Sequence, residues 1–180
     1  MVFLETDRLI LRNLTASDAL IMYDYRNNER CARYQRGQTK DMPGIEQLVF
    51  CHQQDQITTD HPFIVAVALK ETDEMIGEIV AMPNDGAITL GYTFSYRYHR
   101  QGYAYEALSH FIEKLHAMFP NWEFICFTDT ENTASMALLR KLGYADIGYA
   151  EKNDFSFHFK ALENGCFKRF TGKIRGNVLC

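Results

Sequence analysis

"SYRYHRQGYAYEAL", from Ser95 to Leu108, joins two kinds of structure at a single glycine, Gly102. The residues before Gly102 are aromatic and basic, whereas those after it repeat with a helical period. A strand that runs directly into a helix leaves the first amides of that helix without intrahelical acceptors. Their partial positive charge attracts anions, and Arg97 and Arg100 add formal charge at the same turn. The stretch therefore predicts a phosphate-binding turn, although one glycine at such a turn is equally typical of a purely structural junction.

A long amphipathic helix is predicted directly after this turn, over residues 103–119. Its apolar residues recur at spacings of three and four, while Glu106, Glu113 and Lys114 can face water. One face of the helix is therefore apolar and is expected to pack on a sheet. That face consists of Ala104, Ala107, Leu108, Phe111, Ile112, Leu115 and Met118.

β-Branched and aromatic runs on both sides of this helix predict the strands of the sheet. Two of these runs, separated by the polar residues 71–74, form an expected antiparallel hairpin. Thr15 or Ser17 is the expected N-cap of the first helix, and Pro43 suits the first turn of the second. The resulting order predicts a mixed α/β fold: strand 8–14, helix 15–28, helix 43–54, strands 62–70, 75–83 and 87–96, helix 103–119, strand 122–128, helix 132–142, and strands 144–150 and 155–162.

Length and composition favour one globular domain. The 180 residues contain no linker rich in Pro, Gly or Ser, and 47% hydrophobic with 23% charged residues are ordinary for a folded protein. We expect a single domain over residues 1–160. A basic tail follows, residues 161–180, whose weak periodicity is compatible with disorder and to which we assign no function.

Charge and cysteine usage narrow the function classes. The net charge of -4 argues against broad nucleic-acid binding, which depends on neutralising phosphates. Five cysteines without a CxxC pair, and histidines without a spacing such as HExxH, predict neither a disulfide framework nor a metal site. No apolar run reaches the about 20 residues of a bilayer span, and the N-terminus lacks a basic secretion signal. We expect a cytoplasmic protein with no membrane, nucleic-acid or metal partner.

Three segments together resemble a known family. "RQGYAYEAL" at residues 100–108, preceded by "LGYTFSYRYH" and followed by "NTASMALLRKLGY" at residues 132–144, is similar to the acetyl-CoA binding core of the GCN5-related N-acetyltransferases (GNAT), especially their RimJ/RimL-type group. The opening "ETDRLILRNLTASDA" resembles the same group, so the likeness covers roughly residues 4–160. It implies the GNAT fold, a mixed and mostly antiparallel central sheet of about seven strands flanked by about four helices, with acetyl-CoA as cosubstrate.

The resemblance also implies which residues bind acetyl-CoA. The family's loop pattern, Q/R-x-x-G-x-G/A, ends here at Gly102 and Ala104, but His99 stands at its first position and Arg100 where a second glycine is often found. Backbone amides of the loop would hold the pyrophosphate, and the end of the preceding strand would pair with the pantetheine arm. The implied residues are Arg100, Gln101, Gly102, Tyr103 and Ala104 in the loop, and Phe94, Ser95 and Tyr96 in the strand.

A second motif, Asn132-x-x-Ser135, opens the predicted helix 132–142. Its spacing alone is explained by helix capping, in which a side chain accepts from an amide one turn further on. The resemblance instead implies that Asn132 and Ser135 lie beside the pantetheine and the thioester sulfur. Ser135 is then the candidate catalytic residue, which protonates or hydrogen-bonds the departing thiolate. The tyrosine acid of many relatives is absent, because Leu139 stands at its position.

Three candidates stand for the general base. Relatives often carry a glutamate two residues before the glycine of the third strand, where this chain has Thr89. Thr89 cannot act as that base. The candidates are therefore Glu151 and Asp154, in the turn of the last predicted hairpin, and a chain of water molecules.

The resemblance implies an N-acetyltransferase that moves an acetyl group from acetyl-CoA to a primary amine by direct attack. The acceptor is either a small molecule or a protein N-terminus. Thr89 keeps an alternative open, a non-catalytic acyl-CoA sensor or interaction module. An RNA-associated binder that acts through the basic tail is the weakest interpretation, because the chain is acidic overall. Monomer and homodimer are both compatible with the sequence.

Overall fold

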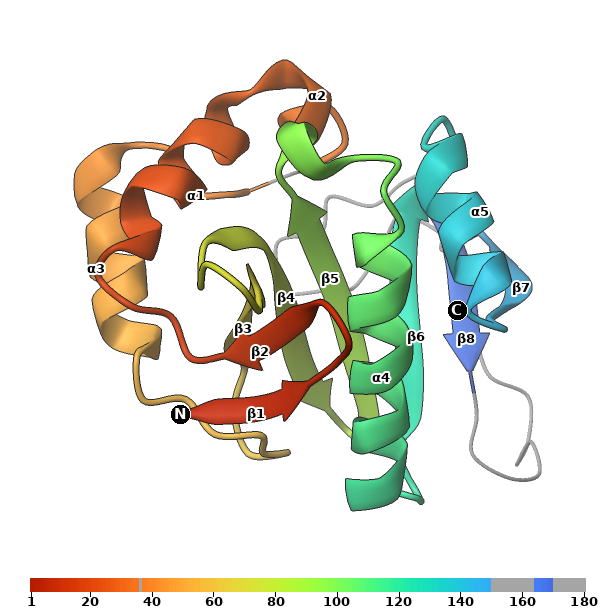
Figure 1. Ribbon diagram of the computed structural model, residues 1–180. Helices are drawn as coiled ribbons and strands as arrows, with labels where there is room; N and C mark the ends of the chain where they lie inside the picture. The colour runs from red at the N-terminus through yellow and green to blue at the C-terminus, as the bar shows by residue number, and fades with distance from the viewer. Residues whose placement is uncertain (36, 150–163, 170–180) are drawn as a thin grey trace.

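The chain folds around one mixed β-sheet with the strand order β1-β2-β3-β4-β5-β6-β8-β7 (Figure 1). The computed structural model describes residues 1–35, 37–149 and 164–169. Within this part of the chain only β5 and β6 pair in parallel, and all other neighbouring strands are antiparallel. The strands are β1 (Val2–Glu5), β2 (Leu9–Arg12), β3 (Phe63–Leu69), β4 (Met75–Asn84), β5 (Ala87–Phe94), β6 (Glu123–Asp129), β7 (Ala145–Tyr149) and β8 (Asn164–Arg169).

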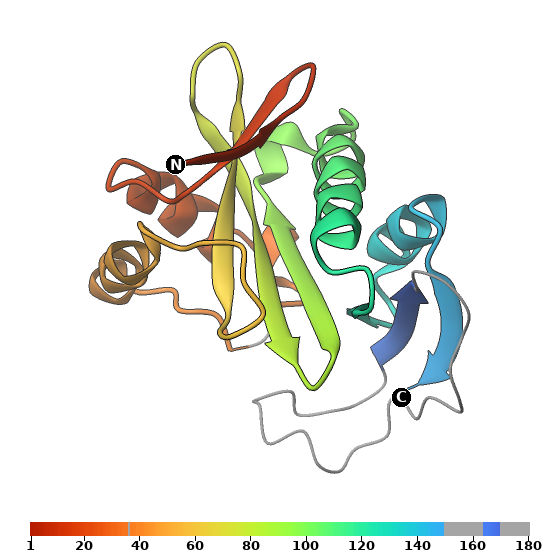
Figure 2. The same cartoon turned by 90° about the horizontal axis from the view of Figure 1, so that it is seen from below.

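Helices cover both faces of the sheet (Figure 2). One face carries α1 and α3, and the opposite face carries α4 and α5. A short 3-10 helix, η1, connects β5 to α4. The helices are α1 (Asp18–Asn27), α2 (Glu29–Ala32), α3 (Met42–His52), η1 (Tyr96–Tyr98), α4 (Tyr103–Met118) and α5 (Thr133–Lys141).

Strand β3 is buried on both of its faces. Six of its seven residues are buried, and successive side chains of a strand point to opposite sides of the sheet. Phe63, Val65 and Val67 join the core beneath α4, whereas Ile64 and Ala66 join the core beneath α1 and α3. The protein therefore has two hydrophobic cores separated by the sheet.

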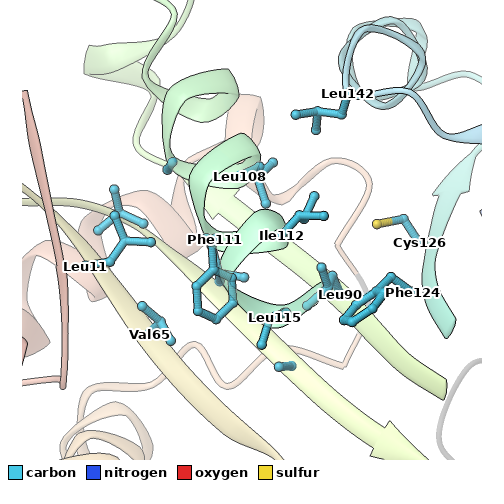
Figure 3. Close-up of a cluster of buried hydrophobic side chains, with 14 of the residues drawn as sticks. Leu11, Val65, Leu90, Leu108, Phe111, Ile112, Leu115, Phe124, Cys126 and Leu142 are labelled. Carbon is cyan, nitrogen blue, oxygen red and sulfur yellow. The ribbon is translucent and has the colours of Figure 1, made fainter. Parts of the chain in front are cut away.

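Helix α4 supplies the centre of the larger core (Figure 3). Leu108, Phe111 and Ile112 point from the helix toward the sheet, and the ring of Phe111 packs edge-on against that of Phe63 with centroids 6.5 Å apart. The predicted amphipathic helix is confirmed, except that Met118 is exposed at its end. This packing holds the N-terminus of α4 beside the end of β5.

Strands β5 and β6 separate before either of them ends. Their parallel pairing stops at Thr89 and Ile125, although β5 continues to Phe94 and β6 to Asp129. Beyond Thr89, the side of β5 that faces β6 therefore has no strand partner in the described sheet. Carboxyl ends of neighbouring parallel strands are a common place for ligands in α/β proteins, and this separation creates such a place.

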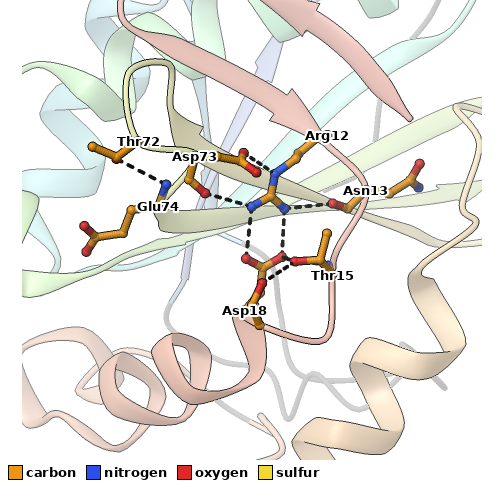
Figure 4. Close-up of polar contacts among 8 residues, drawn as sticks. Arg12, Asn13, Thr15, Asp18, Thr72, Asp73 and Glu74 are labelled. Atoms are coloured by element: carbon orange, nitrogen blue, oxygen red, sulfur yellow. Dashed lines mark hydrogen bonds and ion pairs between the residues drawn. The ribbon is translucent and has the colours of Figure 1, made fainter.

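Arg12, at the end of β2, ties three segments together (Figure 4). Its buried guanidinium donates to both carboxylate oxygens of Asp18 at the start of α1, at 2.7 and 3.0 Å, and to the carboxylate of Asp73 in the β3–β4 turn at 2.7 Å. The amide of Thr15 also donates to Asp18, at 2.7 Å. A buried charge needs such partners.

The N-cap residue of α1 is Ser17, one of the two residues expected there, but its hydroxyl caps no helix amide. The carboxylate of Asp18, the first residue of the helix, accepts from the Thr15 amide instead.

The mixed α/β class predicted from the sequence is confirmed, with two differences. β1 and α2 have four residues each, too few for a periodic pattern to indicate them. The strand expected at residues 155–162 lies outside the described residues. β8 comes from within the expected tail 161–180 and pairs with β6 and β7, so the described sheet extends beyond residue 160.

Gly77 in β4 offers a test of how closely β4 and β5 approach each other. A Cβ at Gly77 would lie 2.6 Å from the carbonyl oxygen of Thr93 and 2.8 Å from the ring of Phe94. Gly77→Ala is therefore expected to lower the free energy of unfolding by about 1–3 kcal/mol, because the strands must shift. Urea denaturation measures the loss. Gly91→Ala in β5 is the matched control, since a Cβ there meets no atom within 4 Å; equal losses in the two variants would contradict the close approach.

Candidate functional site

Two cavities lie where β5 and β6 separate. The loop cavity, of about 470 Å³, lies between the end of β5, the residues that precede α4, and α5. The sheet cavity, of about 350 Å³, lies over β4 and β5 on the side of α1 and α3. The two cavities share one wall. This wall consists of Tyr34, Gln35, Tyr92, Thr93, Asn132 and Ser135.

The loop cavity is built around a left-handed turn. Arg100 and Gly102 have φ angles of +64° and +86°, and Gly102 is the N-cap residue of α4. Glycine adopts this conformation freely, whereas it costs about 1–2 kcal/mol for a residue such as arginine. Arg100 therefore adopts a backbone conformation that glycine would adopt at lower cost.

The first turn of α4 presents free amide groups. The amide of Glu106 is the first that bonds back along the chain, to the carbonyl of Gly102 at 3.1 Å. Among the residues that the structure describes, no acceptor serves the backbone amides of Gly102, Tyr103 and Ala104. Such amides, together with the positive end of the helix dipole, form a binding place for an anion.

Cationic side chains surround the same amides. Arg30, Arg100 and Lys141 line the loop cavity, together with His99, and no carboxylate stands among its described lining residues. The ammonium of Lys141 lies 4.1 Å from the centre of the Tyr105 ring, in a cation–π contact between two lining residues. The cavity is therefore electropositive and suited to a ligand with several negative charges.

Glu106, one turn into α4, has a structural environment. Its carboxylate accepts from the hydroxyl of Thr6 at 2.6 Å, and from the backbone amide and Nε of Arg8 at 3.0 and 2.7 Å. Burial alone would raise the pKa of Glu106, but the hydrogen bonds from Thr6 and Arg8 outweigh it and lower this pKa. Glu106 therefore stays ionised and joins α4 to the β1–β2 turn.

The open side of β5 is occupied by side chains in place of a strand. The carbonyl of Tyr92 accepts from Nε2 of Gln35 at 3.1 Å, and the carbonyl of Phe94 lies 2.9 Å from Nε2 of His99. The two carbonyls point into the space between β5 and β6. His99 thus contacts the end of β5 from within the loop cavity. An extended ligand with amide groups could take over these carbonyls.

A pair of hydroxyl groups stands in the wall between the two cavities. The hydroxyls of Tyr92 and Ser135 are 2.6 Å apart. Burial raises the pKa of Tyr92 far above its ordinary value, so the phenol keeps its proton at physiological pH. The Asn132 side chain accepts from the Ser135 amide at 3.1 Å, which is the capping arrangement that the spacing predicts. This cap fixes the Ser135 hydroxyl opposite Tyr92.

The sheet cavity contains a buried ion pair. Arg26 of α1 donates to both carboxylate oxygens of Glu78 in β4, at 2.7 and 2.8 Å, and to the carbonyl of Thr39 at 3.3 Å. These contacts hold the helix layer and the segment before α3 against the sheet. Beside them, the Nε2 of Gln38 donates to the hydroxyl of Thr93 at 3.1 Å, and the buried Oε1 of Gln38 has no partner in the described part of the chain.

Seven of the ten residues implied for acetyl-CoA binding line the loop cavity, and three do not. Ser95 is buried, and its amide donates to the carbonyl of Ile76 at 2.8 Å, so this amide cannot pair with a ligand. Tyr96 begins η1 and packs toward the core beneath α1. The Gln101 side chain donates to the Arg97 carbonyl. The residues in the lining are Phe94, Arg100, Gly102, Tyr103, Ala104, Asn132 and Ser135.

Several site residues were not predicted from the sequence. The partner of Ser135 is Tyr92. The sequence does carry a signal for the side on which Tyr92 lies, because Tyr92 alternates with Leu90 and Phe94 and all three therefore share one side of β5. Arg26 and Glu78 gave no signal, because their pairing depends on tertiary structure. Glu151 and Asp154 lie outside the described residues, and their role stays a prediction.

The sequence matches the family model of the acetyltransferase (GNAT) domain over residues 8–145. This match includes the left-handed turn, both cavities and the Asn132–Ser135 motif. The chain belongs to the GNAT acetyltransferase family. No curated protein matches the sequence significantly. The described residues contain no group of three or more side chains arranged to hold a metal ion, and no helix of the length and apolarity that a membrane crossing requires.

Solved structures share the GNAT fold at low sequence identity. A GNAT-family acetyltransferase from Bacillus anthracis is 18% identical, with a TM-score of 0.79 over 95% of this chain and 99% of that one. A putative ribosomal-protein-serine acetyltransferase from Vibrio cholerae is 22% identical, with a TM-score of 0.77 over 92% and 95%. RimL, a ribosomal L7/L12 α-N-protein acetyltransferase in complex with coenzyme A, is 14% identical, with a TM-score of 0.74 over 94% and 98%. The predicted GNAT fold is confirmed.

The lowered pKa of Glu106 predicts a pH-dependent contribution to stability. A carboxylate whose pKa is lower in the folded state stabilises the protein above its unfolded pKa, and this contribution disappears as the pH falls through the folded pKa. Glu106→Gln is therefore expected to cost about 1 kcal/mol at neutral pH and progressively less as the pH falls below the ordinary carboxylate range. Thermal or urea unfolding from pH 7 to pH 3 measures this difference.

The exposed Glu113 on the same helix provides the control for that series. Glu113→Gln makes the same chemical change on α4 at a position that contacts neither Thr6 nor Arg8. A Glu106→Gln cost that does not shrink in acid would show that Glu106 contributes through packing and not through its charge.

Proposed function

We propose that this protein is an acetyl-CoA-dependent N-acetyltransferase of the RimJ/RimL type. The observation that carries the proposal is the junction of two cavities of different charge at the Tyr92–Ser135 hydroxyl pair. A thioester in one cavity and an amine in the other would meet at two groups able to donate a proton. Family membership supports this assignment of the cavities.

The loop cavity is the proposed donor site. The free amides at the start of α4, together with Arg30, Arg100 and Lys141, suit the phosphates of acetyl-CoA. The carbonyls of Tyr92 and Phe94 suit the amide groups of the pantetheine arm, which would replace the side chains of Gln35 and His99. The thioester would then reach the wall that both cavities share.

The sheet cavity is the proposed acceptor site. Its described lining includes the carboxylates of Glu78 and Asp129 and the cation of Arg26, so it lacks the excess of positive charge that the loop cavity has. An amine acceptor is favoured where positive charge is not concentrated. Three solved structures of this fold are named for acetylation of ribosomal proteins and one for acetylation of spermidine. We propose a primary amine, of a small molecule or a protein N-terminus, as the acceptor.

The proposed chemistry is direct attack without an acyl-enzyme. The neutral amine attacks the thioester carbonyl carbon, the new C–N bond forms, and the C–S bond breaks after collapse of the tetrahedral intermediate. The thiolate takes a proton from the Ser135 hydroxyl; Tyr92, whose phenol is protonated before the step, passes its proton to Ser135, and solvent returns a proton to Tyr92. The proton of the amine leaves to water or to Glu151 or Asp154. We further propose that the protein acts in the cytoplasm, as a monomer or homodimer, without a metal.

Binding of acetyl-CoA is the first test, with Gly102→Glu as the diagnostic variant. The substitution places a negative charge among the free amides of the turn, so it is expected to abolish binding measured by calorimetry. Gly86→Glu is the matched control, because Gly86 has a similar φ of +77° and lies in the β4–β5 turn, outside both cavities. Wild-type protein that does not bind acetyl-CoA, or Gly102→Glu protein that binds it as tightly, would refute the donor site.

Turnover is the second test, through the hydroxyl pair. Ser135→Ala and Tyr92→Phe are each expected to lower kcat about 100-fold while the affinity for acetyl-CoA changes little, because proton donation is needed only as the thiolate leaves. Release of free thiol with panels of amines and N-terminal peptides measures kcat. Tyr23→Phe, on the exposed face of α1, is the control. Wild-type protein that binds acetyl-CoA but turns over no amine would favour the non-catalytic sensor.

A further inference from the structure

Arg8, in the turn between β1 and β2, contacts the phosphate-binding turn although it lies outside the loop cavity. Its Nε and Nη2 bond the carboxylate of Glu106 at 2.7 and 2.6 Å, and its Nη1 donates to the backbone carbonyl of Gln101 at 3.2 Å. Its guanidinium also stacks on Tyr103, with 4.3 Å between the guanidinium carbon and the ring centre. The Arg8 side chain thus contacts three residues of the turn and of the first turn of α4: Gln101, Tyr103 and Glu106.

The contact with Gln101 fixes the orientation of a peptide plane. The described chain contains no cis peptide bond, and in a trans peptide the carbonyl and the following amide point to opposite sides. The carbonyl of Gln101 and the amide of Gly102 belong to the same peptide. Because Arg8 holds the carbonyl on the outer side, the Gly102 amide points inward, and Gly102 indeed lines the loop cavity whereas Gln101 does not.

Glu106 keeps Arg8 in this position. Glu106 accepts from the Arg8 side chain, the Arg8 backbone and Thr6, so the arginine is anchored at both of its ends. The Glu106 carboxylate also neutralises the charge of Arg8, so Arg8 attracts a distant phosphate only weakly. The contribution of Arg8 to the site is therefore geometric.

We propose that Arg8 and Glu106 form a positioning pair that orients the 101–102 peptide so that the Gly102 amide faces the anion. Neither residue touches the ligand. The left-handed φ of Gly102 leaves this peptide free to rotate, since glycine tolerates several conformations at little cost. The pair removes that freedom before the ligand arrives, and a preorganised donor binds more tightly than one that must be ordered on binding. The inference rests on the proposed function, because it takes the anion to be the pyrophosphate of acetyl-CoA.

The alternative reading is an ordinary surface ion pair. The side chain of Arg8 is 46% exposed, and exposed pairs contribute little to stability. Arg8→Lys separates the two readings, because lysine keeps a cation opposite Glu106 but has a single ammonium that cannot also hold the Gln101 carbonyl. Under the positioning role, Arg8→Lys retains wild-type stability and still binds acetyl-CoA less tightly.

Calorimetry with acetyl-CoA tests the pair. Arg8→Ala is expected to weaken acetyl-CoA binding about tenfold, the loss typical of one charged hydrogen bond, with kcat at saturation within about twofold of wild type. Arg8→Lys is expected to weaken binding several-fold without a change in melting temperature. Lys70→Ala is the control, since Lys70 forms an exposed ion pair with Glu5 in the same part of the sheet and is expected to leave affinity unchanged.

The Gly102 amide provides a second readout by NMR. In wild-type protein its resonance is expected to shift strongly when acetyl-CoA is added, and in Arg8→Ala and Arg8→Lys this shift is expected to shrink. Full affinity and a full Gly102 shift in Arg8→Lys would overturn the inference, because an ion pair alone would then suffice. Wild-type protein that fails to bind acetyl-CoA would instead overturn the proposed function, and this inference with it.

Discussion

The site depends on the early end of pairing between β5 and β6. Because the two strands part after Thr89 and Ile125, a sheet that is otherwise continuous has backbone groups without strand partners in its interior. Unpaired carbonyls in a protein interior are costly, and Gln35 and His99 occupy two of them here. The described groups of the candidate site lie beside this opening: the helix N-terminus on one side, the hydroxyl pair at its centre, and the buried ion pair on the other.

The two cavities differ in charge because different elements line them. The loop cavity takes its cations from α2, α5 and the turn before α4, and its amides from the first turn of α4. The sheet cavity takes its charged groups from α1, β4 and β6, where Arg26 and Glu78 neutralise each other. Sheet and helix layers therefore divide the site into an electropositive half and a nearly balanced half.

Local patterns in the sequence predicted the elements that have clear periods. The apolar face of α4, the hairpin of β3 and β4, and the cap of α5 by Asn132 all follow from short-range rules. Contacts between distant segments could not be predicted in this way. Arg26 meets Glu78 across 52 positions and Arg8 meets Glu106 across 98, and nothing local marks either pair. Ser95 illustrates the same limit, because only the register of β4 against β5 reveals that its amide is taken.

Tyr34, Gln35, Tyr92, Thr93, Asn132 and Ser135 face both cavities, so a ligand on one side of this wall meets the same side chains as a ligand on the other. A ligand that moves Gln35 off the Tyr92 carbonyl also alters the surface that the second ligand finds. Thermodynamic linkage requires any such effect on affinity to be reciprocal. The common wall therefore predicts that a ligand in one cavity changes the affinity of the other cavity for its own ligand.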